Sequence, residues 1–225
     1  MRAPISVVMP TLNSEDELSD TLIALMEGLP LGMIREVIIS DGGSKDATQR
    51  IAEDAGATFL QGDAIRGSQL RRGAEVAKGK WLLFLLPGTV LAPGWSKSVE
   101  LHLKDNEPGY GRLSFVNGGF AGSLVSAWAN IRSRLFGLPF GDQSLLVPAS
   151  LYNQIGGHQD LNSMEDVAIA RALKGRLRPL GYTAQVSAAH FKRDGWFRRG
   201  RRSLWSLLRF LVGPNRAKSG AKLQR

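Results

Sequence analysis

The fold of this 225-residue chain is decided by the stretch Trp81-Leu82-Leu83-Phe84-Leu85-Leu86-Pro87-Gly88-Thr89. Its apolar run is typical of a buried strand, which Pro87 and Gly88 end abruptly in a tight loop. Upstream of it, short apolar runs alternate with segments of helical apolar spacing. These predict strands over 5–9, 37–40 and 58–60 and helices over 14–28, 46–55 and 68–77. Such alternation predicts an α/β fold, a mostly parallel central sheet flanked by helices.

The second half of the chain is less regular. Helices are predicted over 124–135 and from 164 to about 174, with a short apolar strand over 145–147 between them. Trp128 and Arg132 leave the buried face of the first helix undetermined. We find no internal repeat and no low-complexity tract.

The composition excludes several kinds of chemistry. The chain has no cysteine, which rules out disulfides, thiolate metal sites and cysteine nucleophiles and fits a reducing compartment. No apolar run reaches the roughly 18 residues of a membrane-spanning helix. We also expect no signal peptide, because the N-terminus leads directly into an apolar strand.

The net charge of +9 is concentrated at the C-terminus. Residues 191–225 contain 11 Lys and Arg against one acid, Asp194, whereas residues 1–190 contain 18 basic and 19 acidic groups. We therefore expect a domain over 1–190 and a basic extension over 191–225.

The basic cluster of this extension (Arg198, Arg199, Arg201, Arg202) precedes an apolar segment, Leu204–Val212, that contains Trp205 and Phe210. An amphipathic C-terminal helix of this kind fits an anionic membrane surface. The alternative is a helix packed on the domain. Nucleic acid is not expected as a partner, because the rest of the chain offers no basic face.

Three loops should converge on one site. In open parallel sheets ligands bind beyond the carboxyl ends of the strands, and the loops 10–15, 41–44 and 86–89 leave those ends. The first of these loops contains no glycine, which argues against a dinucleotide-binding domain.

Individual residues in these loops have both a functional and a structural interpretation. Asp41 is suited to accept hydrogen bonds from a ribose or a base, or to close the turn before the next helix. Arg66, Arg71 and Arg72 are suited to a diphosphate, or form a solvated helix face. Glu165 and Asp166 point in different directions, so one can act as a general base while the other caps the helix.

Taken together, the ordered motifs resemble a known family. The segments Val7-Val8-Met9-Pro10-Thr11-Leu12-Asn13-Ser14-Glu15 and Ser40-Asp41-Gly42-Gly43-Ser44-Lys45-Asp46-Ala47-Thr48 resemble the opening of family 2 glycosyltransferases, which have the GT-A fold. Five further segments resemble a compact bacterial subgroup of this family. They are Arg66 to Ala74, Gly79 to Leu85, Gly141-Asp142-Gln143, Gly156-Gly157 and Met164-Glu165-Asp166-Val167. The resemblance covers about residues 4 to 212.

The resemblance implies a nucleotide-sugar donor, often a UDP-sugar. By position, the residues around the nucleoside would be Pro10, Asn13, Glu15 and Asp41. Arg66 and Arg71 would lie nearer the diphosphate. Within the Glu165-Asp166 pair, Asp166 would deprotonate the acceptor hydroxyl in a single inverting displacement. We expect a lipid-linked, glycan or other membrane-proximal acceptor and a cytoplasmic protein on the inner face of the membrane.

One position departs from the family pattern. The subgroup usually ends the strand at 81–85 with His-Ala-Asp-Thr, whereas this chain has Leu86-Pro87-Gly88-Thr89. Gly88 is expected to line the donor site but cannot supply the aspartate that holds Mg²⁺ or Mn²⁺. Arg72 also stands where an asparagine is common. We therefore assign no metal ligand and leave the need for a divalent metal open. His190 has two interpretations, a metal ligand as in related folds or a structural residue. The alternative function is a degenerate, non-catalytic GT-A domain that binds a nucleotide or a protein partner.

Overall fold

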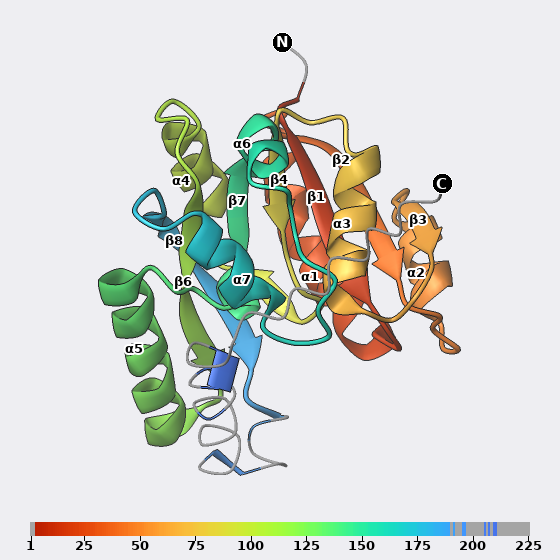
Figure 1. Cartoon of the computed structure of the whole chain (residues 1–225). Coiled ribbons are helices and arrows are strands. Elements are labelled where there is room, and N and C mark those ends of the chain that lie inside the picture. The colour runs from red at the N-terminus through yellow and green to blue at the C-terminus, as the bar shows by residue number, and fades with distance from the viewer. Residues whose placement is uncertain are drawn as a thin grey trace, which may run out of the picture.

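The computed structural model describes residues 3–189, 191, 195, 196, 205, 207, 209 and 210. They form one eight-stranded sheet with the order β3-β2-β1-β4-β7-β6-β8-β5, flanked by helices (Figure 1). The predicted α/β architecture is confirmed.

The first half contains the predicted alternation of strands and helices. Its elements are β1 Ile5–Thr11, α1 Glu15–Leu25, the 3₁₀ turn η1 Met26–Gly28, β2 Ile34–Asp41, α2 Thr48–Asp54, β3 Thr58–Gln61, α3 Arg66–Val76 and β4 Trp81–Phe84. Strands β3, β2, β1 and β4 pair in parallel, in that order. β1 is buried along its whole length, including Thr11 at its carboxyl end. In sheets of this kind the ligand crevice lies beyond that end.

The second half completes the sheet with mixed pairing. Its elements are β5 Thr89–Leu91, α4 Trp95–His102, β6 Gly109–Val116, α5 Gly119–Phe136, the 3₁₀ turn η2 Gly141–Gln143, β7 Leu145–Pro148, α6 Ala149–Gln154, α7 Glu165–Ala172 and β8 Arg178–Ser187. β7 runs antiparallel to β4 and β6, β6 pairs in parallel with β8, and β8 is antiparallel to β5.

Two apolar clusters hold the sheet between its helices. Met9 and Trp95 belong to one cluster, and Val8 and Leu70 belong to the other, because successive side chains of a strand point to opposite faces. Trp95 is fully buried, and its indole N–H donates to the carbonyl of Ala24 at 2.9 Å. This donation satisfies the polar atom of the largest buried side chain.

Only part of the C-terminal extension falls within the described residues. Phe191 and Trp196 both stack edge-on against Phe115 of β6, with ring centroids 4.6 and 5.2 Å away. Trp205, Leu207, Arg209 and Phe210 are helical; Leu207 is buried and Trp205 is exposed. The remaining residues of the predicted amphipathic helix, the basic cluster and His190 lie outside the described part of the chain. No described helix is long and apolar enough to cross a membrane.

Candidate functional site

The loops after β1 and β2 are joined by residues predicted to surround a nucleoside. Asn13 Oδ1 accepts a hydrogen bond from the amide of Lys45 at 2.9 Å, and Glu15 Oε2 accepts one from the amide of Ala47 at 2.8 Å. Pro10 is buried in β1 opposite Ser40. These side chains bring the two strand ends together, as predicted. Their contact with a nucleoside stays a prediction.

Asp41 is buried at the end of β2 and is saturated with hydrogen bonds. Its carboxylate accepts from the hydroxyl of Thr11 at 2.8 Å, the amides of Gly43 and Ser44 at 2.7 and 2.6 Å, and the hydroxyl of Ser44 at 2.5 Å. Burial raises the pKa of Asp41, but these donors outweigh it and hold that pKa below its ordinary value. The turn-closing interpretation therefore describes its contacts here, and its carbonyl accepts a further bond from Arg72 at 2.9 Å.

The arginines at the start of α3 have different surroundings. Arg71 Nη2 donates to Asp160 Oδ2 at 2.7 Å, and the hydroxyl of Ser68 donates to the other oxygen of Asp160. Arg66 instead lines the cavity described below and pairs through Nε with Glu165 Oε1. Of the two arginines predicted to contact the diphosphate, the structure places Arg66 in the crevice and ties Arg71 to a neighbouring loop.

Gln69 is a structural residue that the sequence analysis missed. It is buried, and its amide Nε2 donates to the carbonyls of Thr11 at 2.7 Å and Ser40 at 2.9 Å. It thereby ties α3 to the ends of two strands. The available signal was one polar side chain next to Leu70 near the start of the predicted helix.

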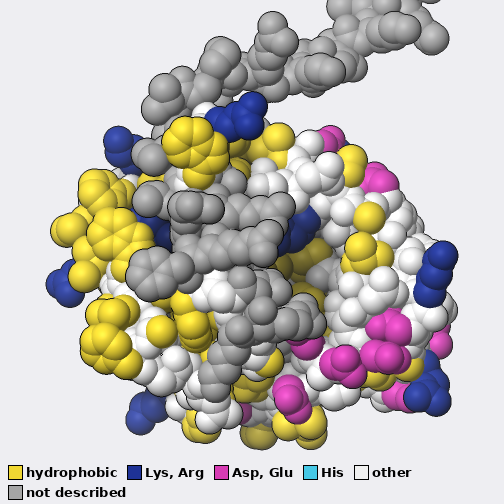
Figure 2. Space-filling view, turned by 90° about the horizontal axis from the view of Figure 1, so that it is seen from below, with side chains coloured by type: hydrophobic (Ala, Val, Ile, Leu, Met, Phe, Trp, Pro, Cys, Tyr) yellow, Lys and Arg dark blue, Asp and Glu magenta, His cyan; other side chains and the backbone are white. Residues whose placement is uncertain are grey.

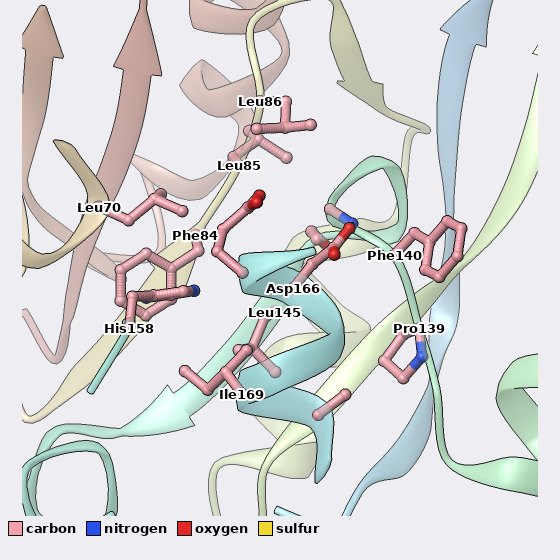
Figure 3. Close-up of a pocket in the computed structure, with 14 residues that line it drawn as sticks. Leu70, Phe84, Leu85, Leu86, Pro139, Phe140, Leu145, His158, Asp166 and Ile169 are labelled. Carbon is pink, nitrogen blue, oxygen red and sulfur yellow. The ribbon is translucent and has the colours of Figure 1, made fainter. Parts of the chain in front are cut away.

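The acidic pair at the start of α7 divides into two roles. Glu165 is buried against Arg66; burial and the nearby Asp166 raise the pKa of Glu165, and Arg66 partly opposes them. Asp166 is half-buried and accepts from the amides of Gly141 at 2.9 Å and Val167 at 2.7 Å. In Figure 3 Asp166 extends from the start of α7 towards the loop that carries Phe140. Met164, just before the pair, has a φ of 67°, a left-handed conformation that is uncommon for residues other than glycine.

Two adjoining cavities meet at Asp142. The first, of about 270 Å³, is lined by charged residues (Arg66, Arg132, Asp142, Asp166) and by an apolar wall (Leu113, Phe115, Val125, Trp128). The second, of about 580 Å³, lies beside Gly88 and is lined by Asp16, Glu17, Asp20 and Asp142, among others. Asp166 thus faces a space that combines both signs of charge with apolar surface.

Arg132 is a cation of this site that the sequence analysis did not assign. It is buried on α5, lies 3.5 Å from the centroid of the Phe140 ring and donates through Nε to the carbonyl of Leu138 at 3.0 Å. Burial lowers the pKa of Arg132 to about 10, with Asp166 and Asp142 opposing the shift, so it stays protonated at neutral pH. The sequence carries little signal for this role, because Arg132 is one of two arginines in the predicted helix.

Gly88 adopts a left-handed conformation with φ of 81°. A Cβ added there would lie 3.1 Å from Glu17 Oε2, so a side chain at this position would press against a carboxylate. Among the described residues, no group of three or more His, Asp or Glu is arranged to hold a metal ion. The carboxylate of Asp41 is already occupied by hydrogen bonds. The residues present therefore do not fit the metal site implied by the family, and no step of the proposed reaction uses a metal.

Comparisons with known proteins bear on the family and the fold of this chain. The family model described as Glycosyl transferase family 2 matches residues 6–129, more than half of the chain. None of the curated proteins compared with the sequence matches it.

Solved structures share the fold. S. aureus TarS matches with a TM-score of 0.65 and 19% identity, over 84% of this chain and 38% of that one. S. aureus TarS 1-349 in complex with UDP matches with a TM-score of 0.64 and 20% identity, over 82% and 61%. Glucosyl-3-phosphoglycerate synthase from Mycobacterium tuberculosis, with Mg²⁺ and UDP, matches with a TM-score of 0.56 and 17% identity, over 82% and 70%. This chain spans less than two thirds of the TarS structures. The likeness confirms the predicted GT-A fold.

Proposed function

This chain belongs to glycosyl transferase family 2, and from that premise we propose that it transfers a sugar from a UDP-sugar to a hydroxyl of a lipid-linked or other membrane-proximal acceptor, with inversion. Two solved structures that share its fold contain UDP, which supports the choice of donor.

The observation that carries this proposal is the position of Asp166. Its carboxylate lies on the wall of the first cavity, which combines charged and apolar residues, whereas Glu165 beside it is buried and paired with Arg66. Each oxygen of Asp166 accepts one backbone amide, which leaves lone pairs to receive a proton. Asp166 is therefore the base and Glu165 is a positioning residue for Arg66.

The proposed reaction is a single displacement. Asp166 takes the proton of the acceptor hydroxyl while that oxygen bonds to the anomeric carbon and the bond from this carbon to the diphosphate oxygen breaks. UDP leaves with the bonding electrons and gains negative charge. Arg66 and Arg132 line the same cavity and offset this charge, because positioned cations stabilise a developing anion without reorganisation.

The apolar wall of the cavity supports an acceptor with an apolar part. Leu113, Phe115, Val125 and Trp128 face the same space as Asp166. A free sugar acceptor would gain little from such a wall, whereas the chain of a lipid-linked acceptor would bury it.

The test is UDP release from a panel of UDP-sugars, with and without a membrane lipid extract as acceptor. We expect release that depends on both the donor and the extract. Asp166→Asn serves as the inactive control. Release at the same rate from both proteins would contradict the proposal.

Gly88 favours a second candidate function, a domain that binds UDP or a protein partner without catalysis. The cavity beside it is lined by carboxylates and would repel a diphosphate that has no cation. Calorimetry with UDP separates the two candidates: UDP binding without turnover of any UDP-sugar would favour the second.

We also propose that the basic extension attaches the protein to the inner, anionic face of the membrane. The support is the sequence, with 11 basic residues against one acid after residue 190. Truncation after Asp194 should weaken sedimentation with anionic vesicles, and added salt should do so in the intact protein.

A further inference from the structure

Helix α5 carries large apolar side chains on its outward face. Phe120, Leu124, Trp128, Ile131 and Leu135 follow one another at spacings of three or four residues and are exposed, Phe120 by 80% and Leu135 by 71%. This spacing places all five on one stripe of the helix, which we call the α5 stripe. A stripe of this kind normally faces the core.

The inward face of α5 is held by other means. Asn130 exchanges hydrogen bonds with both backbone groups of Leu113 on β6, at 2.9 and 3.0 Å, and the hydroxyl of Ser133 donates to Gln143 at 2.6 Å. The residues buried on this side include Gly122 and Ala129, whose small size allows close packing. The orientation of α5 is thus fixed by polar contacts, and the stripe faces outward.

The charges around the stripe indicate what covers it. The 18 residues of α5 contain no Asp, Glu or Lys, and Arg134 is exposed on the same helix, with Arg112 exposed on the adjacent strand β6. Figure 2 shows large apolar side chains gathered on the left of this face, with basic ones among them, whereas most acidic side chains lie on the right, where basic ones lie too. An apolar stripe beside arginines complements an anionic lipid surface.

The stripe also adjoins the acceptor cavity. Trp128 belongs to the stripe and lines the cavity that contains Asp166. A lipid-linked acceptor whose chain stays in the bilayer would reach the base along this residue.

We propose that the α5 stripe inserts into the headgroup and acyl boundary of an anionic bilayer, with α5 lying along the surface. At 18 residues the helix is about 27 Å long, and the exposed Arg134 keeps it at the interface. The binding itself does not depend on the proposed sugar transfer; only the delivery of the acceptor along Trp128 rests on it.

The test uses the full chain and vesicles of phosphatidylcholine, alone or with about a third phosphatidylglycerol. The variant Phe120→Gln/Leu124→Gln/Leu135→Gln removes three stripe residues that do not line the cavity. The matched control is Ile23→Gln/Met26→Gln/Leu29→Gln, which removes three exposed apolar residues of α1 and the turn after it. We expect the wild type and the control to sediment with anionic vesicles, and the stripe variant to partition at least about tenfold more weakly.

A second measurement does not depend on the folding of the triple variant. Bromine-labelled acyl chains should quench the tryptophan fluorescence of the wild type, and Trp128→Phe should remove much of that quenching. Vesicle binding by the stripe variant equal to the wild type, or no quenching in the wild type, would overturn the proposal. A wild-type dimer that the stripe variant dissociates would assign the stripe to a second copy instead. Loss of vesicle binding with UDP release intact would leave the proposed function standing.

Discussion

The two halves of the crevice use their polar residues differently. In the β1–β2 half, Asn13, Glu15 and Asp41 are engaged with neighbouring loops, so their polarity builds the strand ends. In the β6–α7 half, Arg132 and Asp166 lie on the wall of a cavity that also exposes apolar surface. This difference supports our proposal that the second half supplies the groups that meet a substrate, on a frame that the first half builds.

The strongest test of this division removes the proposed base. Asp166→Asn should lower turnover of UDP-sugar by at least about a hundredfold, because an amide cannot accept the acceptor proton, while UDP affinity changes little. The matched control is Asp160→Asn, which removes a carboxylate that is bonded to Arg71 and Ser68 and lines neither cavity. Full activity of the Asp166 variant would remove the assignment.

The two halves should also differ in acid sensitivity. Burial and the charge of Arg66 lower the pKa of His158, near α7, to about 3. A folded-state pKa below the unfolded value means that the unfolded chain binds more protons, so stability is lost as pH falls from about 6.5 towards 3. Asp41, whose pKa is lowered from 3.8, loses its contribution only below about pH 4.

His158→Asn tests this difference. Asparagine can keep a polar atom near the Nδ1 position, which lies 3.0 Å from the Tyr152 hydroxyl, and does not titrate. Between pH 7 and 5 the free energy of unfolding of the wild type should fall by about 2 kcal/mol more than that of the variant. Glu165 acts in the opposite direction, because its raised pKa makes stability fall as pH rises. Comparing denaturant titrations of the two proteins at each pH cancels the contribution of Glu165, because both proteins contain it. Parallel plots of the free energy of unfolding against pH would contradict the prediction.

The next test separates the two arginines of α3. Arg66→Ala should weaken UDP binding at least about tenfold, the cost of a lost charge-assisted hydrogen bond, and Arg71→Ala should cost less because Arg71 is bonded to Asp160. Arg66→Ala also leaves Glu165 buried without its partner. The comparison is therefore repeated with Glu165→Gln present in both proteins. If calorimetry shows the same loss of UDP affinity for the two variants, the diphosphate lies nearer Arg71 than the position of Arg66 in the cavity suggests.

Much of the β1–β2 half could be predicted from the sequence, and less of the β6–α7 half. The parallel strands β1 to β4 were predictable because each is a short apolar run between helical segments. β6 and β8 were not predicted, since Gly109, Gly111, Pro179 and Gly181 interrupt their apolar pattern.

The orientation of α5 shows a second limit. Its apolar spacing was readable, but the face it turns to the core depends on the hydrogen bonds of Asn130 and Ser133 to distant segments. The same hydrogen bonds orient the helix so that Arg132 lies in the site. Asp166 was predictable only through the family resemblance, because helix capping explains an acidic pair at a helix start equally well.

The smallest expected effect concerns metal. UDP affinity in EDTA should lie within a few-fold of that in Mn²⁺, because Arg66 and Arg132 carry charge that binds phosphate oxygens without a metal. A tenfold or larger gain on adding Mn²⁺ would contradict this. It would mean that a residue such as His190, outside the described part of the chain, or Asp41 completes a metal site.

Gly88→Asp turns the same measurement into a comparison of the two halves. The new carboxylate would lie against Glu17, so in EDTA two negative groups should repel the diphosphate, and Mn²⁺ should restore binding by bridging them. The ratio of UDP affinities in Mn²⁺ and EDTA should therefore rise above tenfold in this variant only. Gly88→Ala is the matched control, since at φ of 81° both side chains carry a backbone strain of about 1 kcal/mol but only one adds charge. If the ratio stays near one in both variants, the diphosphate does not lie beside Gly88, and Arg66 and Arg132 of the first cavity hold it alone.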